Sequence, residues 1–148
     1  MNIRHKLAVL LTAFIAALIS LTVDFVHVSG KELSGAELMS DTAEVTVEVR
    51  DRTGTQLLET YALTRGQGTA LQSLLLRGSY LRTFSETAQV GKDELTYDIY
   101  IYLPEQQKTI RFAALGSRLL ASPDTFGGWL KIRDKDWEIA FNGILAIS

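Results

Sequence analysis

One apolar run near the N-terminus constrains this chain more than any other feature. The run begins at Leu7 and ends at Val23, directly after the short basic leader MNIRHK. A helix of a soluble protein carries a polar face, whereas this run offers only the hydroxyl side chains of Thr12, Ser20 and Thr22. We therefore expect the run to enter a membrane and the rest of the chain to fold on the far side.

The length of the run leaves two fates open. An apolar signal-peptide core spans about 7 to 15 residues, whereas a membrane-spanning helix needs roughly 20. Cleavage after Val28-Ser29-Gly30 would leave Lys31 as the new N-terminus and a secreted protein, although the Ala-x-Ala pattern is missing. We favour an uncleaved single-pass anchor. Arg4 and Lys6 would then keep the N-terminus in the cytoplasm and place the C-terminal domain outside it.

Chain length and charge define the rest of the organisation. We predict a signal peptide or signal-anchor helix over residues 1–30, a small polar tether over residues 31–42 and one domain over residues 43–148. The net charge is −2, and no clustered basic stretch is present. We therefore expect no nucleic-acid partner, because such a partner requires a basic surface.

Cysteine and histidine are nearly absent from the chain. There is no cysteine, and both histidines, His5 and His27, lie in or beside the apolar run. We therefore expect a folded domain without Ser-His or Cys-His nucleophile pairs, the usual zinc sites or an imidazole acid or base. Phosphate loops and catalytic serine motifs are also missing from the sequence. These observations predict a protein that is not an enzyme and uses no cofactor or metal.

Alternating apolar and polar residues predict the first hairpin. Residues 43–50 alternate strictly, and DRTGT has the chemistry of a three-residue hairpin loop. A second strand would then cover residues 56–63. In this register Val49 lies opposite Leu57.

A leucine stripe predicts the single helix of the domain. Gly66-Gln67-Gly68 breaks the chain, Thr69 can cap, and residues 70–77 place three leucines on one stripe before Gly78. We expect this short helix to pack on the sheet and residues 79–84 to form an extended edge segment.

The clearest strand covers residues 95–103, and Pro104 begins the turn into a second strand over residues 108–114. Pairing Leu103 with Lys108 makes every inner pair apolar, which supports this register. The inner pairs are Ile101 with Ile110, Ile99 with Phe112, and Tyr97 with Ala114.

The same register gives a candidate partner-binding surface on the outer face of this hairpin. Its residues are Asp98, Tyr100, Tyr102 and Arg111. Tyr100 beside Arg111 would form a cation–π pair, and an aromatic stripe with one guanidinium is a surface that a protein or glycan can contact. The alternative is that these residues are ordinary cross-strand partners or are covered by another segment.

The C-terminal part predicts a loop followed by more strands. Residues 115–128 would cross the sheet as a loop, with Phe126 filling the core. Residues 129–133 and 137–141 would form a hairpin, and residues 144–148 a terminal strand. The fold class is therefore α+β, an antiparallel sheet of about five to seven strands with one short helix.

The order of these elements resembles a known group of proteins. A strand, a hairpin, a helix and further hairpins that end in a Trp-Leu-Lys-Ile strand (WLKI) resemble small membrane-tethered or secreted domains of unknown function from Gram-positive bacteria. The resemblance covers the chain from Glu44 to Phe141. It implies an uncharacterised family, so it transfers no functional residue.

Three functions remain open from the sequence. The first is an extracytoplasmic binding or regulatory module with a protein partner. The second is an immunity or inhibitor protein that blocks a partner enzyme through a sheet edge or the Tyr100 face. The third is a cell-wall glycan hydrolase, which needs two carboxylates roughly 5 to 10 Å apart. Asp98, Glu94 and Asp124 are the candidates for that pair.

Overall fold

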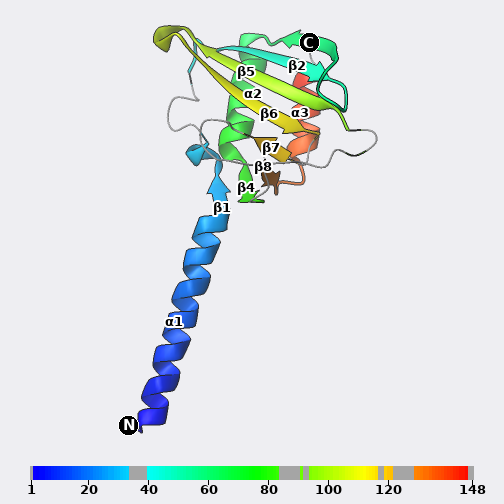
Figure 1. Cartoon of the computed structure of the whole chain (residues 1–148). Coiled ribbons are helices and arrows are strands. Elements are labelled where there is room, and N and C mark those ends of the chain that lie inside the picture. Colours follow the sequence, from blue (N-terminus) through cyan, green and yellow to red (C-terminus); the bar gives the residue numbers. More distant parts are fainter. Residues whose placement is uncertain are drawn as a thin grey trace.

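The apolar run forms a long helix, α1 (Ile3–Val26), which projects from the rest of the chain in this computed structural model (Figure 1). The structure describes residues 2–33, 40–83, 91, 94–116, 119–121 and 129–146. None of the stretch Ile3–Ser20 is buried against the domain. By length and composition α1 suffices to cross a membrane, a property that a signal sequence shares.

A short strand, β1 (His27–Ser29), follows α1 without a gap and pairs with β4 (Ser79–Arg82). A 3-10 turn, η1 (Gly30–Glu32), comes next, and its first residue packs against the end of a helix of the domain. Val28 and Leu33 are both buried. The sheet therefore begins within residues 1–30, the segment predicted to be a signal peptide or a signal-anchor helix. Within the predicted tether Leu33 is buried and Lys31 and Glu32 are exposed, while residues 34–39 lie outside the described part.

The described strands form one antiparallel sheet in the order β1-β4-β8-β7-β6-β5-β2-β3. The remaining strands are β2 (Glu44–Arg50), β3 (Leu57–Ala62), β5 (Thr96–Leu103), β6 (Lys108–Leu115), β7 (Leu119–Ala121) and β8 (Trp129–Ile132). The α+β class and the antiparallel pairing are confirmed. The eight described strands exceed the predicted number.

Two helices, α2 (Arg65–Arg77) and α3 (Trp137–Ala146), lie together on one face of the sheet (Figure 1). The core lies between this face and the helices. Its largest buried side chains include Trp137, Tyr80, Phe112, Leu71 and Leu75. The buried Gln67 side chain joins the two helices by donating to the Ile144 carbonyl at 2.9 Å.

The central hairpin of β5 and β6 has the predicted register, with Leu103 opposite Lys108 and Ile99 opposite Phe112. A 3-10 turn, η3 (Pro104–Gln106), connects the two strands, and Gln107 closes it in the left-handed region with φ 49°.

The predicted register of the first hairpin is wrong, because Val49 lies opposite Glu59. The loop is longer than three residues. The Asp51 carboxylate accepts the N–H groups of Thr55 and Gln56 at 2.9 and 3.1 Å. A register shift beside Arg50 absorbs the extra residue as a bulge.

The helix α2 begins five residues earlier than predicted, at Arg65. Thr64 and Gln67 form a capping box, in which each side chain accepts the backbone N–H of the other residue. Two glycines therefore lie in the first turn instead of breaking the helix. Gly68 packs closely on β2, because a Cβ at this position would lie 3.2 Å from Val45 Cγ2.

The predicted C-terminal hairpin and the prediction of a single helix in the domain are wrong, since residues 137–146 form a second helix. This helix also replaces the described part of the predicted terminal strand, whose residues 147–148 lie outside the described residues. Trp137, Phe141, Ile144 and Leu145 are buried, which is the spacing of one helix face, while Ile139 is 73% exposed. β8 pairs instead with β4 and β7.

Two further segments differ from their predictions. β4 was expected at an edge but lies inside the sheet, because β1 covers its outer side. β7 lies within the segment predicted as a loop, whereas Phe126 and Asp124 fall outside the described residues.

Candidate functional site

The predicted surface residues lie on the sheet face away from α2 and α3, and Asp98 is at their centre. Asp98 is only 8% exposed. Its Oδ1 accepts from Arg111 at 2.8 Å and its Oδ2 accepts from Arg50 at 3.1 Å. Arg50 also donates to Glu48 at 2.7 Å. Adjacent strands thus supply a chain of alternating charges across β2, β5 and β6.

The charges of this network compensate one another. The hydrogen bond to Glu48 raises the pKa of Arg50, and the hydrogen bond to Asp98 raises that of Arg111. The predicted cation–π pair is present, since the guanidinium carbon of Arg111 lies 5.8 Å from the centre of the Tyr100 ring. Tyr102 lies two residues further along β5 and is 38% exposed.

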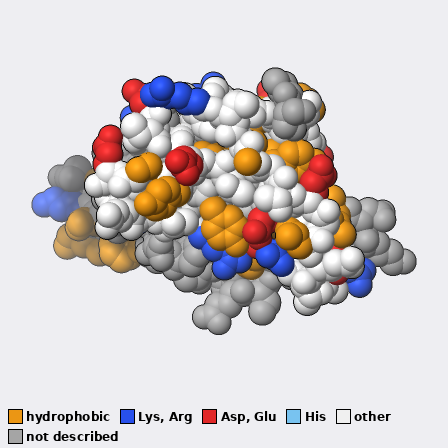
Figure 2. Space-filling model, turned by 90° about the horizontal axis from the view of Figure 1, so that it is seen from above, with side chains coloured by type: hydrophobic (Ala, Val, Ile, Leu, Met, Phe, Trp, Pro, Cys, Tyr) orange, Lys and Arg blue, Asp and Glu red, His pale blue; other side chains and the backbone are white. Residues whose placement is uncertain are grey.

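Seen from above, the molecule shows acidic, basic and hydrophobic side chains interspersed on one face (Figure 2). The predicted surface itself combines the carboxylates of Glu48 and Asp98 with the guanidinium groups of Arg50 and Arg111, so it has no single charge sign that would select a ligand by electrostatics alone. The structure brings Asp98, Tyr100 and Arg111 into contact, and their role as a partner surface stays a prediction.

A different site, which the sequence did not predict, lies on the helix side of the sheet. Two adjoining hollows of about 300 and 260 Å³ share Leu95, Tyr97 and Asn142. We call them together the acidic groove. Its described lining comprises Val49, Glu59, Tyr61, Glu94, Leu95, Tyr97, Gly116, Glu138, Phe141, Asn142, Leu145 and Ala146.

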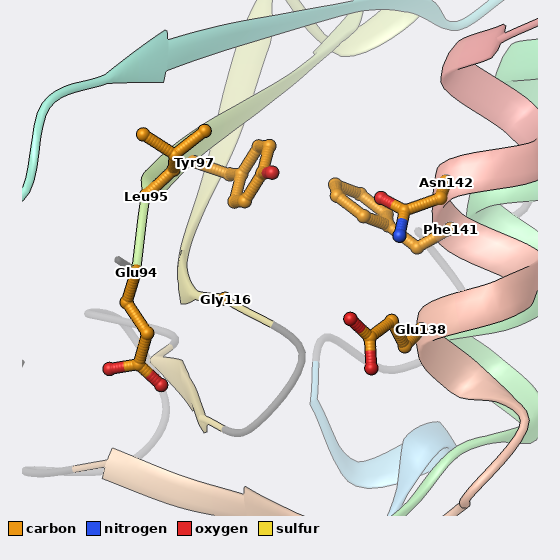
Figure 3. Close-up of a pocket in the computed structure, with 7 residues that line it drawn as sticks. All are labelled: Glu94, Leu95, Tyr97, Gly116, Glu138, Phe141 and Asn142. Carbon is orange, nitrogen blue, oxygen red and sulfur yellow. The ribbon is translucent and has the colours of Figure 1, made fainter. Parts of the chain in front are cut away.

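Aromatic rings form the centre of the acidic groove. Tyr97 meets Phe141 edge to face, with ring centres 5.1 Å apart, and Phe141 stacks on Trp137 at 4.9 Å. Figure 3 shows Tyr97 reaching from the sheet towards Phe141 and Asn142 on α3. The rings are held by core packing, so this part of the groove is preformed.

Carboxylates surround these rings. Glu138 extends from α3 into the hollow, whereas Glu94 lies at the opposite wall (Figure 3) and accepts the N–H of Gly91 at 2.7 Å. Glu59 lies further along the groove on β3. None of the described lining residues is Lys or Arg. The described lining of the groove therefore contains three carboxylates and no basic residue.

The nearby carboxylates raise the pKa values of two tyrosines in the groove. Burial raises the pKa of Tyr97, and the charge of Glu138 raises it further. Hydrogen bonding to Glu59 raises the pKa of Tyr61. A cationic group in the groove would meet carboxylates together with aromatic rings, the combination that binds ammonium and guanidinium groups.

Sequence reasoning missed Glu138 and Phe141 as site residues because it placed them on a strand, and it missed Asn142 because this residue lay beyond the end of that strand. The available signal was the helical spacing of Trp137, Phe141 and Leu145. Asp98 and Glu94 were candidates for the carboxylate pair of a glycan hydrolase, but the structure does not bring them together. Asp98 is held by two arginines on the outer face, and Glu94 lines the groove.

The expectation of a folded domain without histidine is wrong. α1 ends at Val26, so His27 begins β1, and its Nε2 lies 2.9 Å from the Ser79 hydroxyl oxygen. In the part of the chain that the structure describes, no group of three His, Asp or Glu side chains is placed to hold a metal ion.

Comparison of the chain with known protein families, with curated proteins and with solved structures finds no match. The resemblance inferred from the order of the elements stays a prediction. Arguments about function therefore rest on the chemistry of the surfaces described above.

Proposed function

We propose that this protein is a non-enzymatic binding module held at the outer face of the cytoplasmic membrane by α1, and that its acidic groove binds a ligand with a cationic group. The observation that carries the proposal is the lining of the groove. Glu59, Glu94 and Glu138 surround Tyr61, Tyr97 and Phe141, with no basic residue among the described lining.

The packing of β1 supports an uncleaved anchor. Val28 is 1% exposed and lies opposite Tyr80 in the sheet. Cleavage after Gly30 would remove β1 and expose the side of β4 that it covers. It would also remove the hydrogen bond from the Gly30 N–H to Gly78. β1 can contribute to the stability of the domain only if it stays attached to the rest of the chain.

The preformed shape of the groove supports binding rather than catalysis. Phe141 is buried in the core and the half-buried Tyr97 packs against it, so this part of the groove is held in place, as expected for a docking site of modest size. The outer face with Tyr100 and Arg111 remains a candidate for a second contact with a protein partner.

The proposal is tested with trilysine amide as the probe and triglutamate amide as the matched control. The full-length protein is held in lipid nanodiscs, and the aromatic side chains are observed by NMR. We expect trilysine, and not triglutamate, to shift the ring signals of Tyr97 and Phe141. Raising the salt concentration should weaken the effect, because the attraction is between charges.

Two variants locate the site. Glu138→Gln should weaken trilysine binding several-fold, because it removes a carboxylate that reaches into the groove. Glu44→Gln removes an exposed carboxylate from β2 outside the groove and should leave binding unchanged. Equal binding of both peptides, or equal effects of both variants, would refute the cationic ligand.

A further inference from the structure

The sheet has two edges that differ in length and surroundings. β1 forms one edge, has three residues and continues directly from α1. β3 forms the other edge, and its six residues contain no proline or lysine. Among the described strands, none pairs with its free side. An edge strand of this length without such protection is open to pairing with another chain.

The hydrogen-bond pattern shows which groups of β3 face outwards. The Leu63 N–H donates to the Val45 carbonyl at 3.0 Å, which makes these residues a hydrogen-bonded pair. Antiparallel pairs alternate, so Tyr61 and Glu59 also direct their backbone groups towards β2. Thr60 and Ala62 therefore direct their N–H and C=O groups to the free edge.

The side chains of β3 connect this edge to the acidic groove. Glu59 and Tyr61 line the groove together with Leu145 of α3. A strand added antiparallel to β3 would place its residues opposite Glu59 and Tyr61 in non-hydrogen-bonded pairs, with Cα atoms only about 4.5 Å apart. Its side chains at these positions would lie over the groove.

The negative charge of Glu59 determines which kind of strand can pair favourably with the free edge of β3. Glu59 is a carboxylate on the face that an added strand would cover, and an apolar residue opposite it would cover the carboxylate without supplying an opposite charge. A second copy of β3 (LLETYA) brings another glutamate and no basic residue. A strand with Lys or Arg opposite Glu59 would instead form a cross-strand ion pair.

We infer that β3 is the docking edge for an extended basic segment of a partner protein, which adds antiparallel to the sheet and places Lys or Arg over the acidic groove. The inference rests on the proposed function and names the ligand as a peptide. The edge lies at the opposite end of the strand order from β1, and Figure 1 shows β2, the neighbour of β3, far from α1. A partner outside the membrane can therefore reach it.

The experiment uses a random decapeptide library displayed on phage, selected against the full-length protein in nanodiscs. We expect the enriched peptides to carry Lys or Arg at alternate positions. Thr60→Pro removes an N–H that faces the free edge and none that pairs with β2. It should weaken binding about tenfold, roughly the loss of one backbone hydrogen bond. Thr60→Ala keeps the N–H and should bind within about twofold of the wild type.

A second measurement leaves the protein unchanged. Methylating single backbone nitrogens of an enriched peptide should weaken binding at every second position, namely where the peptide N–H faces Thr60 or Ala62. This pattern is expected only for strand addition, so it decides the case even if Thr60→Pro perturbs the fold.

The two proposals fail in different ways. Basic peptides that bind equally well to the wild type and Thr60→Pro, with no alternating effect of methylation, would overturn strand addition and leave the cationic groove standing. Enriched peptides without basic residues, or no enrichment at all, would overturn the docking of a basic strand, whereas the cationic groove is refuted only if trilysine and triglutamate bind equally or the Glu138→Gln and Glu44→Gln variants have equal effects.

Discussion

The backbone N–H of Gly30 donates to the carbonyl of Gly78 at 2.9 Å, joining the segment after α1 to the end of α2. The contact is close, because a Cβ at Gly30 would overlap the carbonyl oxygens of Leu75 and Leu76. The segment that follows α1 is therefore joined to the domain through packed structure at this point.

Gly30→Ala is expected to lower the free energy of unfolding by about 1–3 kcal/mol, the usual cost of forcing a methyl group into a packed site. The matched control is Gly66→Ala in the first turn of α2, where a Cβ meets nothing within 4 Å. That variant should stabilise by about 0.4–1 kcal/mol, since it reduces the entropy of the unfolded chain. Urea unfolding of the full-length protein in detergent measures both, and equal effects would contradict the close contact.

The sequence could predict the elements whose pattern is local. In β5 and β6 the inner pairs Tyr97–Ala114, Ile99–Phe112 and Ile101–Ile110 are formed by aromatic or aliphatic side chains, and the chain reverses at Pro104, so one register buries these residues together. The N-terminal helix followed from composition alone. The same local reasoning found Asp98, Tyr100 and Arg111 as neighbours, because their positions depend on that register.

The helix α3, the strand β1 and the acidic groove could not be predicted because they depend on tertiary contacts. The segment from Trp137 to Ala146 has apolar residues that suit either a short strand or a helix, and packing against α2 decides the outcome. β1 forms only because β4 is available beside it. The acidic groove was unpredictable for the same reason, since Glu59, Glu94 and Glu138 come together only when α3 lies on the sheet.

Two isoleucines of α3 distinguish the observed helix from the predicted hairpin. Ile144→Ala should destabilise the protein by about 2–5 kcal/mol, because this side chain is 9% exposed and packs in the core. Ile139→Ala should change stability by no more than about 0.5 kcal/mol, because Ile139 is 73% exposed. In the predicted hairpin Ile139 would face inwards, so a large loss at this position would argue for the strand. Chemical denaturation of both variants gives the answer.

Asp98 is expected to matter more than its partners on the outer face. Asp98→Ala leaves Arg50 and Arg111 without the carboxylate that holds both, and should cost about 1–3 kcal/mol of unfolding free energy. Arg111→Ala should cost less, since the Arg111 side chain is 52% exposed and water screens its charge. Equal losses from the two substitutions in denaturation experiments would show that Asp98 has no central role.

Acid should weaken the hairpin of β2 and β3 through Asp51. Its carboxylate accepts backbone N–H groups of Gln56 and Thr55 and the Thr53 hydroxyl, and these bonds lower its pKa. The stability that this provides is present above the ordinary aspartate pKa of about 3.9 and is lost as the pH falls through the lower pKa of the folded state. Asp51→Asn should therefore lose less stability than the wild type between pH 6 and pH 3. Equal losses of stability in the two proteins over this range would count against these bonds.

The effect of the Glu138 charge on Tyr97 can be tested by titration. Burial and the charge of Glu138 raise the pKa of Tyr97 above the ordinary value of about 10. Its contribution to stability is therefore full below that value and is lost as the pH rises through the pKa of the folded state. Glu138→Gln should lower the pKa of Tyr97, because only the burial effect remains. Glu44→Gln, which lies outside the groove, should leave this pKa unchanged. NMR titration with ring-labelled tyrosine follows Tyr97 separately, and an unchanged pKa in Glu138→Gln would show that Glu138 does not face the ring and that the groove lacks its central charge.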